Sequence, residues 1–120
     1  MDRKIEKVEG EFSVCKVTDF SKVDNSLEFT FTGRTDEEYS LVCPTTQAPQ
    51  NALEREDGWK MFRVAGILDF SLIGVLAKIS SLLAQKGIGI FVISTFNTDY
   101  ILVKKEDYDR AYDAMKEGGI

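Results

Sequence analysis

Residues 71–103 read SLIGVLAKISSLLAQKGIGIFVISTFNTDYILV, and this stretch decides the fold. In its first half, apolar side chains recur at the period of an α-helix. The pattern predicts a helix from Ser71 to Lys86, and Gly87 is typical of the left-handed residue that follows a helix. The repeating apolar positions are Leu72, Leu76, Ile79 and Leu83, and Ile73, Val75 and Leu82 broaden the stripe.

Two strands and a second helix complete the second half of the chain. The apolar run 88–96 predicts a central strand buried on both faces. Asn97-Thr98 marks a tight turn, and residues 99–103 return as the partner strand. Residues 59–65 predict another strand before the first helix. The second helix, which Gly118-Gly119 ends, has its apolar positions at Tyr108, Ala111, Tyr112 and Met115.

The first half predicts short strands without a long helix. Residues 11–17 alternate loosely between apolar and polar and predict a strand entered through a break at Gly10. Residues 27–32 and 39–43 predict a hairpin, because they alternate and are rich in β-branched and aromatic side chains. The polar residues 33–37 supply its turn.

Two polar stretches interrupt this half. Residues 19–25 predict a short helical turn, and residues 45–58, with Pro49 and an acidic cluster, predict a linker. We therefore place the boundary of the two halves after residue 57, giving 1–57 and 58–120.

The order strand, helix, strand, strand, helix predicts an α+β fold of the ferredoxin-like βαββαβ type that lacks its last strand. We expect the N-terminal segment to supply the missing edge strand. The two halves would then pack as one unit.

Charge and composition exclude several classes of function. The net charge of −5 and the pI near 4.8 argue against a nucleic-acid partner, which needs clustered Lys and Arg. The charge is uneven, since residues 1–57 carry seven basic and thirteen acidic side chains and residues 58–120 carry eight and seven. The second half can therefore tolerate an anionic ligand. No apolar run approaches the roughly 20 residues of a membrane span, and a cytoplasmic location is predicted.

Few residues are suited to catalysis or metal binding. The absence of histidine removes the commonest catalytic base and metal ligand, and no phosphate-binding loop motif occurs. Cys15 and Cys43 lie in apolar runs, so we expect them to be buried, reduced thiols. We expect no cofactor and no enzyme activity. An enzyme with Asp69 or Asp99 as base has no positive support.

Topology brings two complementary loops together in such a fold. The loop that leads into the first helix ends at a helix N-terminus, where the free amides of Ser71, Leu72 and Ile73 suit a carboxylate. The hairpin turn offers acceptors at Asn97, Thr98 and Asp99, which suit an ammonium group. A free amino acid carries both charges.

Each of these residues also has a purely structural interpretation. Asp69 can act only as a helix cap, and the turn residues can serve only the turn. Phe70 and Phe96 are expected in a core or an interface. Gly74, three positions into the predicted helix, indicates either tight packing or a close ligand, because glycine costs about 1 kcal/mol there relative to alanine. The joint placement of the loops favours the binding interpretation.

The blocks VAGILDFSLIGVLA (64–77) and KGIGIFVISTFNTDYILV (86–103) resemble the ACT domain, in particular short tandem ACT proteins of bacteria and archaea. The second block is also similar to the ACT regions of aspartate kinases and of the animal cytosolic arginine sensors. EYSLVCP (38–44) resembles the degenerate first ACT unit of the short tandem proteins.

The resemblance implies an amino acid bound between ACT units and a homodimer. It nominates as ligand-binding residues Asp69, Phe70, Ser71, Leu72, Ile73, Thr95, Phe96, Asn97, Thr98 and Asp99. The alternative is a structural module that oligomerises without a ligand.

Overall fold

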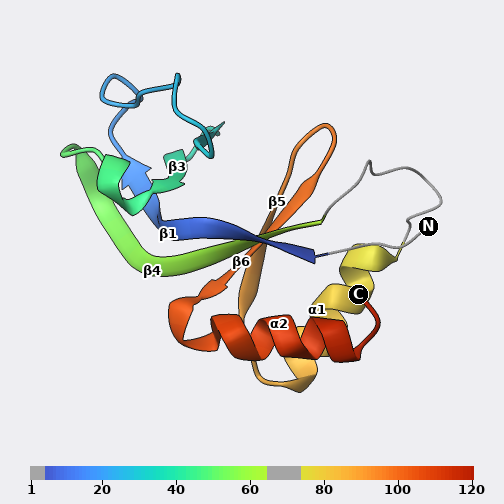
Figure 1. The fold of residues 1–120 in the computed structure, drawn as a ribbon. Coiled ribbons are helices and arrows are strands. Elements are labelled where there is room, and N and C mark those ends of the chain that lie inside the picture. Colours follow the sequence, from blue (N-terminus) through green and yellow to red (C-terminus); the bar gives the residue numbers. More distant parts are fainter. Residues whose placement is uncertain (1–4, 65–73) are drawn as a thin grey trace. The chain divides into compact units, whose positions relative to one another are not determined.

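The computed structural model describes residues 5–64 and 74–120. The chain divides into two compact units, which we call unit 1 (Met1–Glu9 with Lys60–Ile120) and unit 2 (Gly10–Trp59). Figure 1 shows the elements in the colours of the chain order, most of them labelled. The strands are β1 (Ile5–Val17), β2 (Phe31–Arg34), β3 (Tyr39–Pro44), β4 (Ala52–Val64), β5 (Ile90–Ser94) and β6 (Asp99–Lys104). The helices are α1 (Val75–Gln85) and α2 (Tyr108–Glu117), and Thr45–Gln47 and Lys105–Asp107 form short 3-10 turns.

Unit 1 has the strand order β1-β4-β6-β5. In chain order it contains β4, α1, β5, β6 and α2, and the N-terminal part of β1 supplies the remaining edge strand beside β4. This is the ferredoxin-like βαββαβ arrangement. The predicted fold class is confirmed, and so is the expectation that the N-terminal segment supplies the missing strand.

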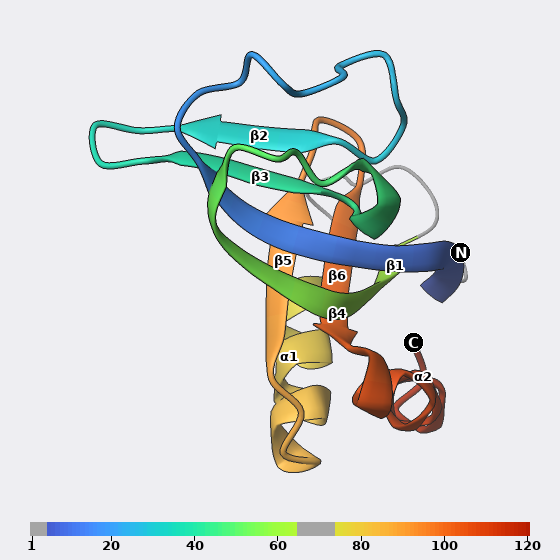
Figure 2. The same ribbon diagram turned by 90° about the vertical axis from the view of Figure 1, so that its left-hand side faces the viewer.

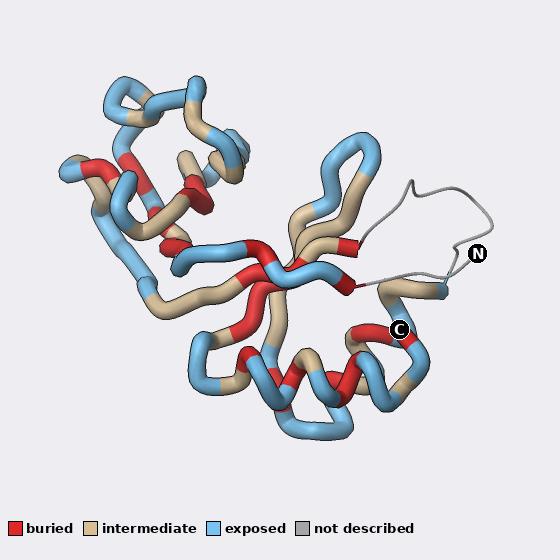
Figure 3. Tube along the Cα trace, in the orientation of Figure 1, coloured by how far each residue is buried: buried red, intermediate tan, exposed pale blue. Residues whose placement is uncertain are grey.

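Both helices of unit 1 cover the same face of its sheet. Their buried side chains meet in one core with residues of β4 and β6 that are two positions apart and therefore face the same way. Figure 3 shows buried positions recurring along α2. The core includes Phe62, Val64, Ile79, Leu83, Ile101, Val103, Ala111 and Met115.

Unit 2 repeats the same topology almost without helices. Its strand order is β2-β3-β1-β4. Here β1 is the first strand of the repeat, as β4 is in unit 1, and β4 is the last strand, as β1 is in unit 1. Residues 18–30 stand where unit 1 has α1, and the turn Thr45–Gln47 stands where unit 1 has α2. Phe20, from the segment that replaces α1, packs on the sheet of unit 2, with its ring centroid 5.1 Å from that of Tyr39.

Residues 19–25 form tight turns instead of the predicted helical turn. Asp19 Oδ1 accepts hydrogen bonds from the backbone N–H and the hydroxyl of Ser21, and Asp24 Oδ1 accepts the same pair from Ser26. A short acidic side chain that binds the amide two residues on stabilises such turns and competes with a helix.

Three predicted strand bounds in the first half are wrong. Strand β1 begins at Ile5, and Gly10 lies inside it with φ at +98° instead of preceding it. Strand β2 begins only at Phe31. The predicted linker is strand from Ala52 onward, because β4 is the edge strand of unit 2 and charged side chains are usual on an edge.

The predicted central strand 88–96 is also wrong. Strand β5 spans only Ile90–Ser94 and lies at the edge of unit 1, beside β6 (Figure 2). Its apolar side chains are half-buried, with Ile90 and Val92 packed against the core. The hairpin to β6 is confirmed, with Ser94 paired to Asp99.

Helix α1 begins four residues later than predicted. Gly74 precedes it with φ at +93°, a conformation that cannot lie within a right-handed helix. A Cβ added to Gly74 would meet nothing within 4 Å, so backbone conformation and not tight packing explains this glycine. The predicted end is confirmed: Gly87 has φ at +72°, and Ile88 N–H donates to the Leu83 carbonyl at 3.0 Å.

No helix in the described ranges is long and apolar enough to cross a membrane.

The conformation of Gly74 leads to a stability prediction. Gly74→Ala is expected to lower the free energy of unfolding by about 1 kcal/mol, because alanine is strained at positive φ. Urea denaturation followed by circular dichroism measures the change. Gly89→Ala is the matched control, since Gly89 lies outside the positive-φ region and has equally open surroundings, and it should leave stability unchanged or raise it slightly. Equal effects of the two substitutions would contradict the explanation.

Candidate functional site

The β5–β6 turn is held by its own hydrogen bonds. The backbone N–H and the hydroxyl of Thr95 both donate to the Thr98 carbonyl, at 2.8 and 3.0 Å. At the strand pair that precedes the turn, the Ser94 hydroxyl donates to Asp99 Oδ1 at 2.5 Å. A carboxylate has about four acceptor positions, so this contact leaves Asp99 able to accept from a ligand as well.

The predicted turn residues differ in exposure. Thr95, Phe96 and Asn97 are exposed, whereas Thr98 and Asp99 are half-buried. Phe96 is 100% exposed, so the structure does not place its ring in a core. A single exposed phenylalanine is common on protein surfaces, and this one is compatible with the interface role that the sequence left open.

The other five predicted residues lie outside the described residues. They are Asp69, Phe70, Ser71, Leu72 and Ile73. Their proximity to the turn therefore stays a prediction. Because α1 begins at Val75 and its first hydrogen bond joins Lys78 N–H to the Gly74 carbonyl at 2.8 Å, the free amides of this helix are those just after Gly74.

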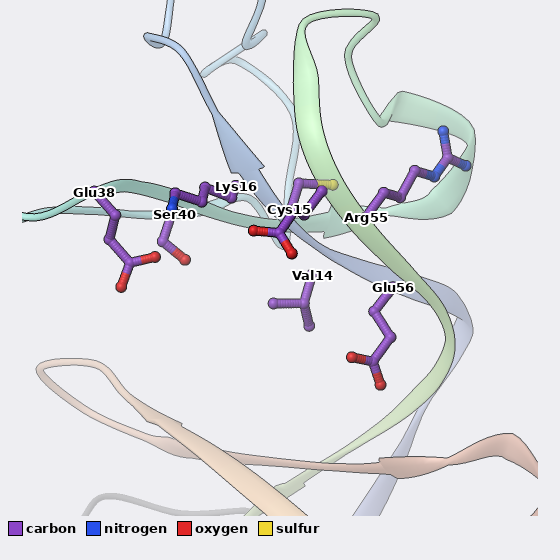
Figure 4. Close-up of a pocket in the computed structure, with 8 residues that line it drawn as sticks. Val14, Cys15, Lys16, Glu38, Ser40, Arg55 and Glu56 are labelled. Carbon is purple, nitrogen blue, oxygen red and sulfur yellow. The ribbon is translucent and has the colours of Figure 1, made fainter.

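Unit 2 contains an acidic pocket that the sequence did not predict. It has a volume of about 400 Å³, and Figure 4 shows Val14, Glu38 and Glu56 pointing to the same side while Arg55 points away. Its three carboxylates outnumber its two cations, and this excess of negative charge favours a positively charged group. The net negative charge of the first half is the only sequence signal of it. The lining residues are Val14, Cys15, Lys16, Glu38, Ser40, Glu54, Arg55 and Glu56.

A chain of polar contacts leads from the buried Ser13 to the exposed Asp57 and Arg55 of unit 2. The fully buried Ser13 hydroxyl donates to Asp57 Oδ1 at 2.5 Å and lies 2.9 Å from the Thr45 hydroxyl, which can donate to it. Arg55 Nε donates to the same Asp57 oxygen at 2.7 Å. The bonds from Arg55 and then Ser13 lower the pKa of the Asp57 carboxyl. The arrangement satisfies a buried hydroxyl and is structural.

The two cysteines are free and buried, as predicted. They belong to the core of unit 2, where Cys15 pairs with Leu41 and Cys43 with Ser13, so the thiols are diagonal neighbours on adjacent strands. Burial, and then the neighbouring Cys15, raises the pKa of Cys43 to about 11. Burial also raises the pKa of Cys15. Such thiols are poor nucleophiles at neutral pH.

Comparison with known proteins points to one family. The sequence model of the ACT domain matches residues 54–117. A protein of Agrobacterium tumefaciens is similar over 99% of this chain and 90% of its own, with 29% identity and a TM-score of 0.86. A Vibrio cholerae protein of unknown function, described as a possible transport protein, is 27% identical over 99% of this chain and 91% of its own, with a TM-score of 0.81.

The regulatory subunit of aspartate kinase from Thermus thermophilus, in its ligand-free form, shares the fold. It is 10% identical over 95% of both chains, with a TM-score of 0.66. The predicted similarity to aspartate kinase regions is thus confirmed at the level of fold.

The raised pKa of Cys43 predicts loss of stability in alkali. The folded chain keeps the thiol protonated up to about pH 11, whereas the unfolded chain ionises it near pH 9. The free energy of unfolding is therefore unaffected by this thiol below pH 9 and falls as pH rises from 9 towards 11. The full loss for a shift of two pKa units is about 2.7 kcal/mol, of which about 2 kcal/mol is expected by pH 10.5. Urea denaturation at pH 8 and pH 10.5 measures it. Cys43→Ala should lose less stability between these pH values than the natural chain, and an identical loss would contradict the assignment.

Proposed function

The chain belongs to the ACT domain family, and we propose that it is a non-enzymatic regulatory protein that binds a free amino acid where two ACT units meet. The observation that carries the proposal is the β5–β6 turn, which presents polar acceptors and an exposed aromatic ring at the end of the edge strand β5.

The turn supports binding of an ammonium group. The half-buried Asp99 has acceptor positions beyond its bond from Ser94, and the exposed Asn97 lies two residues before it. Charge-assisted hydrogen bonds to a carboxylate are about twice as strong as neutral ones. Asp99 is therefore the residue on which the affinity should depend most.

The start of α1 supports binding of a carboxylate. Helix α1 connects β4 to β5 and runs in the direction opposite to both strands. Its N-terminus therefore lies towards the end of the sheet at which β5 enters the turn. The amides after Gly74 and the positive end of the helix dipole suit an anionic group. Asp69 to Ile73 precede this helix and remain proposed ligand-binding residues.

Strand β5 supports pairing with a second copy. Its sequence IFVIS contains no charge and no proline, the usual protections of an edge strand. Two copies related by a two-fold axis can pair their β5 strands antiparallel, which gives both partners the same contact. Each β5–β6 turn would then lie beside the start of the other copy's β5, and Phe96 would be covered.

Binding is tested by thermal shift of the full chain against the twenty amino acids. At least one should stabilise it, by about 2.7 kcal/mol at 100 times its dissociation constant. Asp99→Asn should weaken that ligand about tenfold. Asp36→Asn is the matched control, because the Thr35–Glu38 turn of unit 2 closes with the same Thr35 N–H to Glu38 carbonyl bond. No response to any amino acid would contradict the proposal.

Dimerisation is tested by sedimentation. The chain should be a dimer, and Ile93→Lys should make it a monomer, because a charge on an edge strand opposes edge pairing. Leu53→Lys is the control, since Leu53 is 60% exposed on β4 and should leave the dimer intact. A monomeric natural chain would contradict the pairing, and a dimer that binds no amino acid would favour the purely structural module.

A further inference from the structure

Unit 1 contains a second pocket, remote in sequence from the β5–β6 turn. Its volume is about 360 Å³, within the range of sites for small metabolites. Two adjacent strands and the start of α2 form it. The lining residues are Lys7, Val8, Glu9, Lys60, Tyr108 and Asp109.

Tyr108 gives this pocket a fixed wall. Its hydroxyl donates to the Met61 carbonyl at 2.7 Å, and its ring stacks on that of Phe62 with the centroids 4.3 Å apart. The side chain is only 6% exposed. A ring held at both its face and its hydroxyl cannot rotate away, so the pocket has a defined aromatic surface.

Two ammonium groups lie within cation–π distance of that ring. Lys60 Nζ lies 4.7 Å and Lys7 Nζ lies 5.5 Å from the centroid of the Tyr108 ring, and Lys7 Nζ lies nearer the Tyr112 ring, at 4.6 Å. Lys7 also forms an ion pair with Asp109, at 3.6 Å. Lys60 has no ion pair with any carboxylate in the part of the chain that the structure describes. The pocket lining thus holds two ammonium groups, Lys7 paired with Asp109 and Lys60 without a described carboxylate partner.

We propose that this pocket binds a small organic anion, whose carboxylate or phosphate oxygens are held by Lys60 and Lys7 while its remaining atoms lie against Tyr108 and Val8. An anionic oxygen near the two ammonium groups reduces the repulsion between them and supplies a counter-charge to Lys60, which pairs with no carboxylate among the described residues. The proposal shares no residue with the amino-acid site and stands or falls separately from it.

Glu9 limits the affinity of this pocket. Its carboxylate lines the same cavity and repels an anionic ligand. Removal of the Lys60 charge and removal of the Glu9 charge should therefore change the affinity in opposite directions. Damage to the fold would weaken binding in both variants, so the pair of variants separates a charge effect from misfolding.

The test is a two-dimensional ¹H–¹⁵N NMR titration of the full chain with inorganic phosphate and, separately, with succinate, at constant ionic strength set with NaCl. We expect saturable shifts of the Val8, Glu9, Lys60 and Asp109 amides. Lys60→Gln should weaken binding about tenfold, and Glu9→Gln should strengthen it. Lys86→Gln, an exposed lysine outside the pocket, should leave it unchanged.

The stronger of the two probes identifies the acid group that the pocket prefers. Three results would overturn the proposal: shifts that do not saturate with either anion, equal shifts with NaCl alone, or binding that Lys60→Gln leaves unchanged.

Discussion

The sharing of β1 and β4 between the two units is the constraint on which the structure depends. A strand inside a sheet must find hydrogen-bond partners on both sides, and the continuous segment Lys60–Ile120 of unit 1 lacks its fourth strand. Unit 1 takes its last strand from Ile5–Glu9, and unit 2 takes its last strand from the first half of β4. Each long strand therefore has a different role at its two ends, first in one repeat and last in the other.

Sequence patterns predicted the elements of this fold correctly where the apolar period is strong. They failed for strands whose amino-acid composition depends on their position in the sheet. The helix periods, Gly87 and the β5–β6 hairpin follow from local preferences. The edge position of β5 does not, because an apolar run of five residues suits a buried strand and an interface strand equally. The charged residues after Ala52 read as a linker because an exposed edge strand carries no apolar alternation.

The candidate site was predictable in part for the same reason. Turn chemistry predicted a tight turn at Asn97-Thr98, since Asn and Thr between two apolar strands indicate one, and the observed turn begins two residues earlier, at Thr95. The beginning of α1 was displaced, because a helical apolar period continues through Gly74 although its backbone cannot be helical there. The pockets were missed altogether, since they combine residues far apart in the chain, such as Lys7, Lys60 and Tyr108.

The shared strands also determine into which fragments this protein can be divided. Unit 1 is discontinuous, so no single cut in the chain releases it with all four strands. Its last helix is followed by Ile120, which is buried in the same core as Ile5. A circular permutant that joins the end of the chain to β1 and opens near Lys60 would turn unit 1 into one continuous βαββαβ segment. In that order the domain could be fused to another protein, whereas in the natural order any fusion carries unit 2 with it.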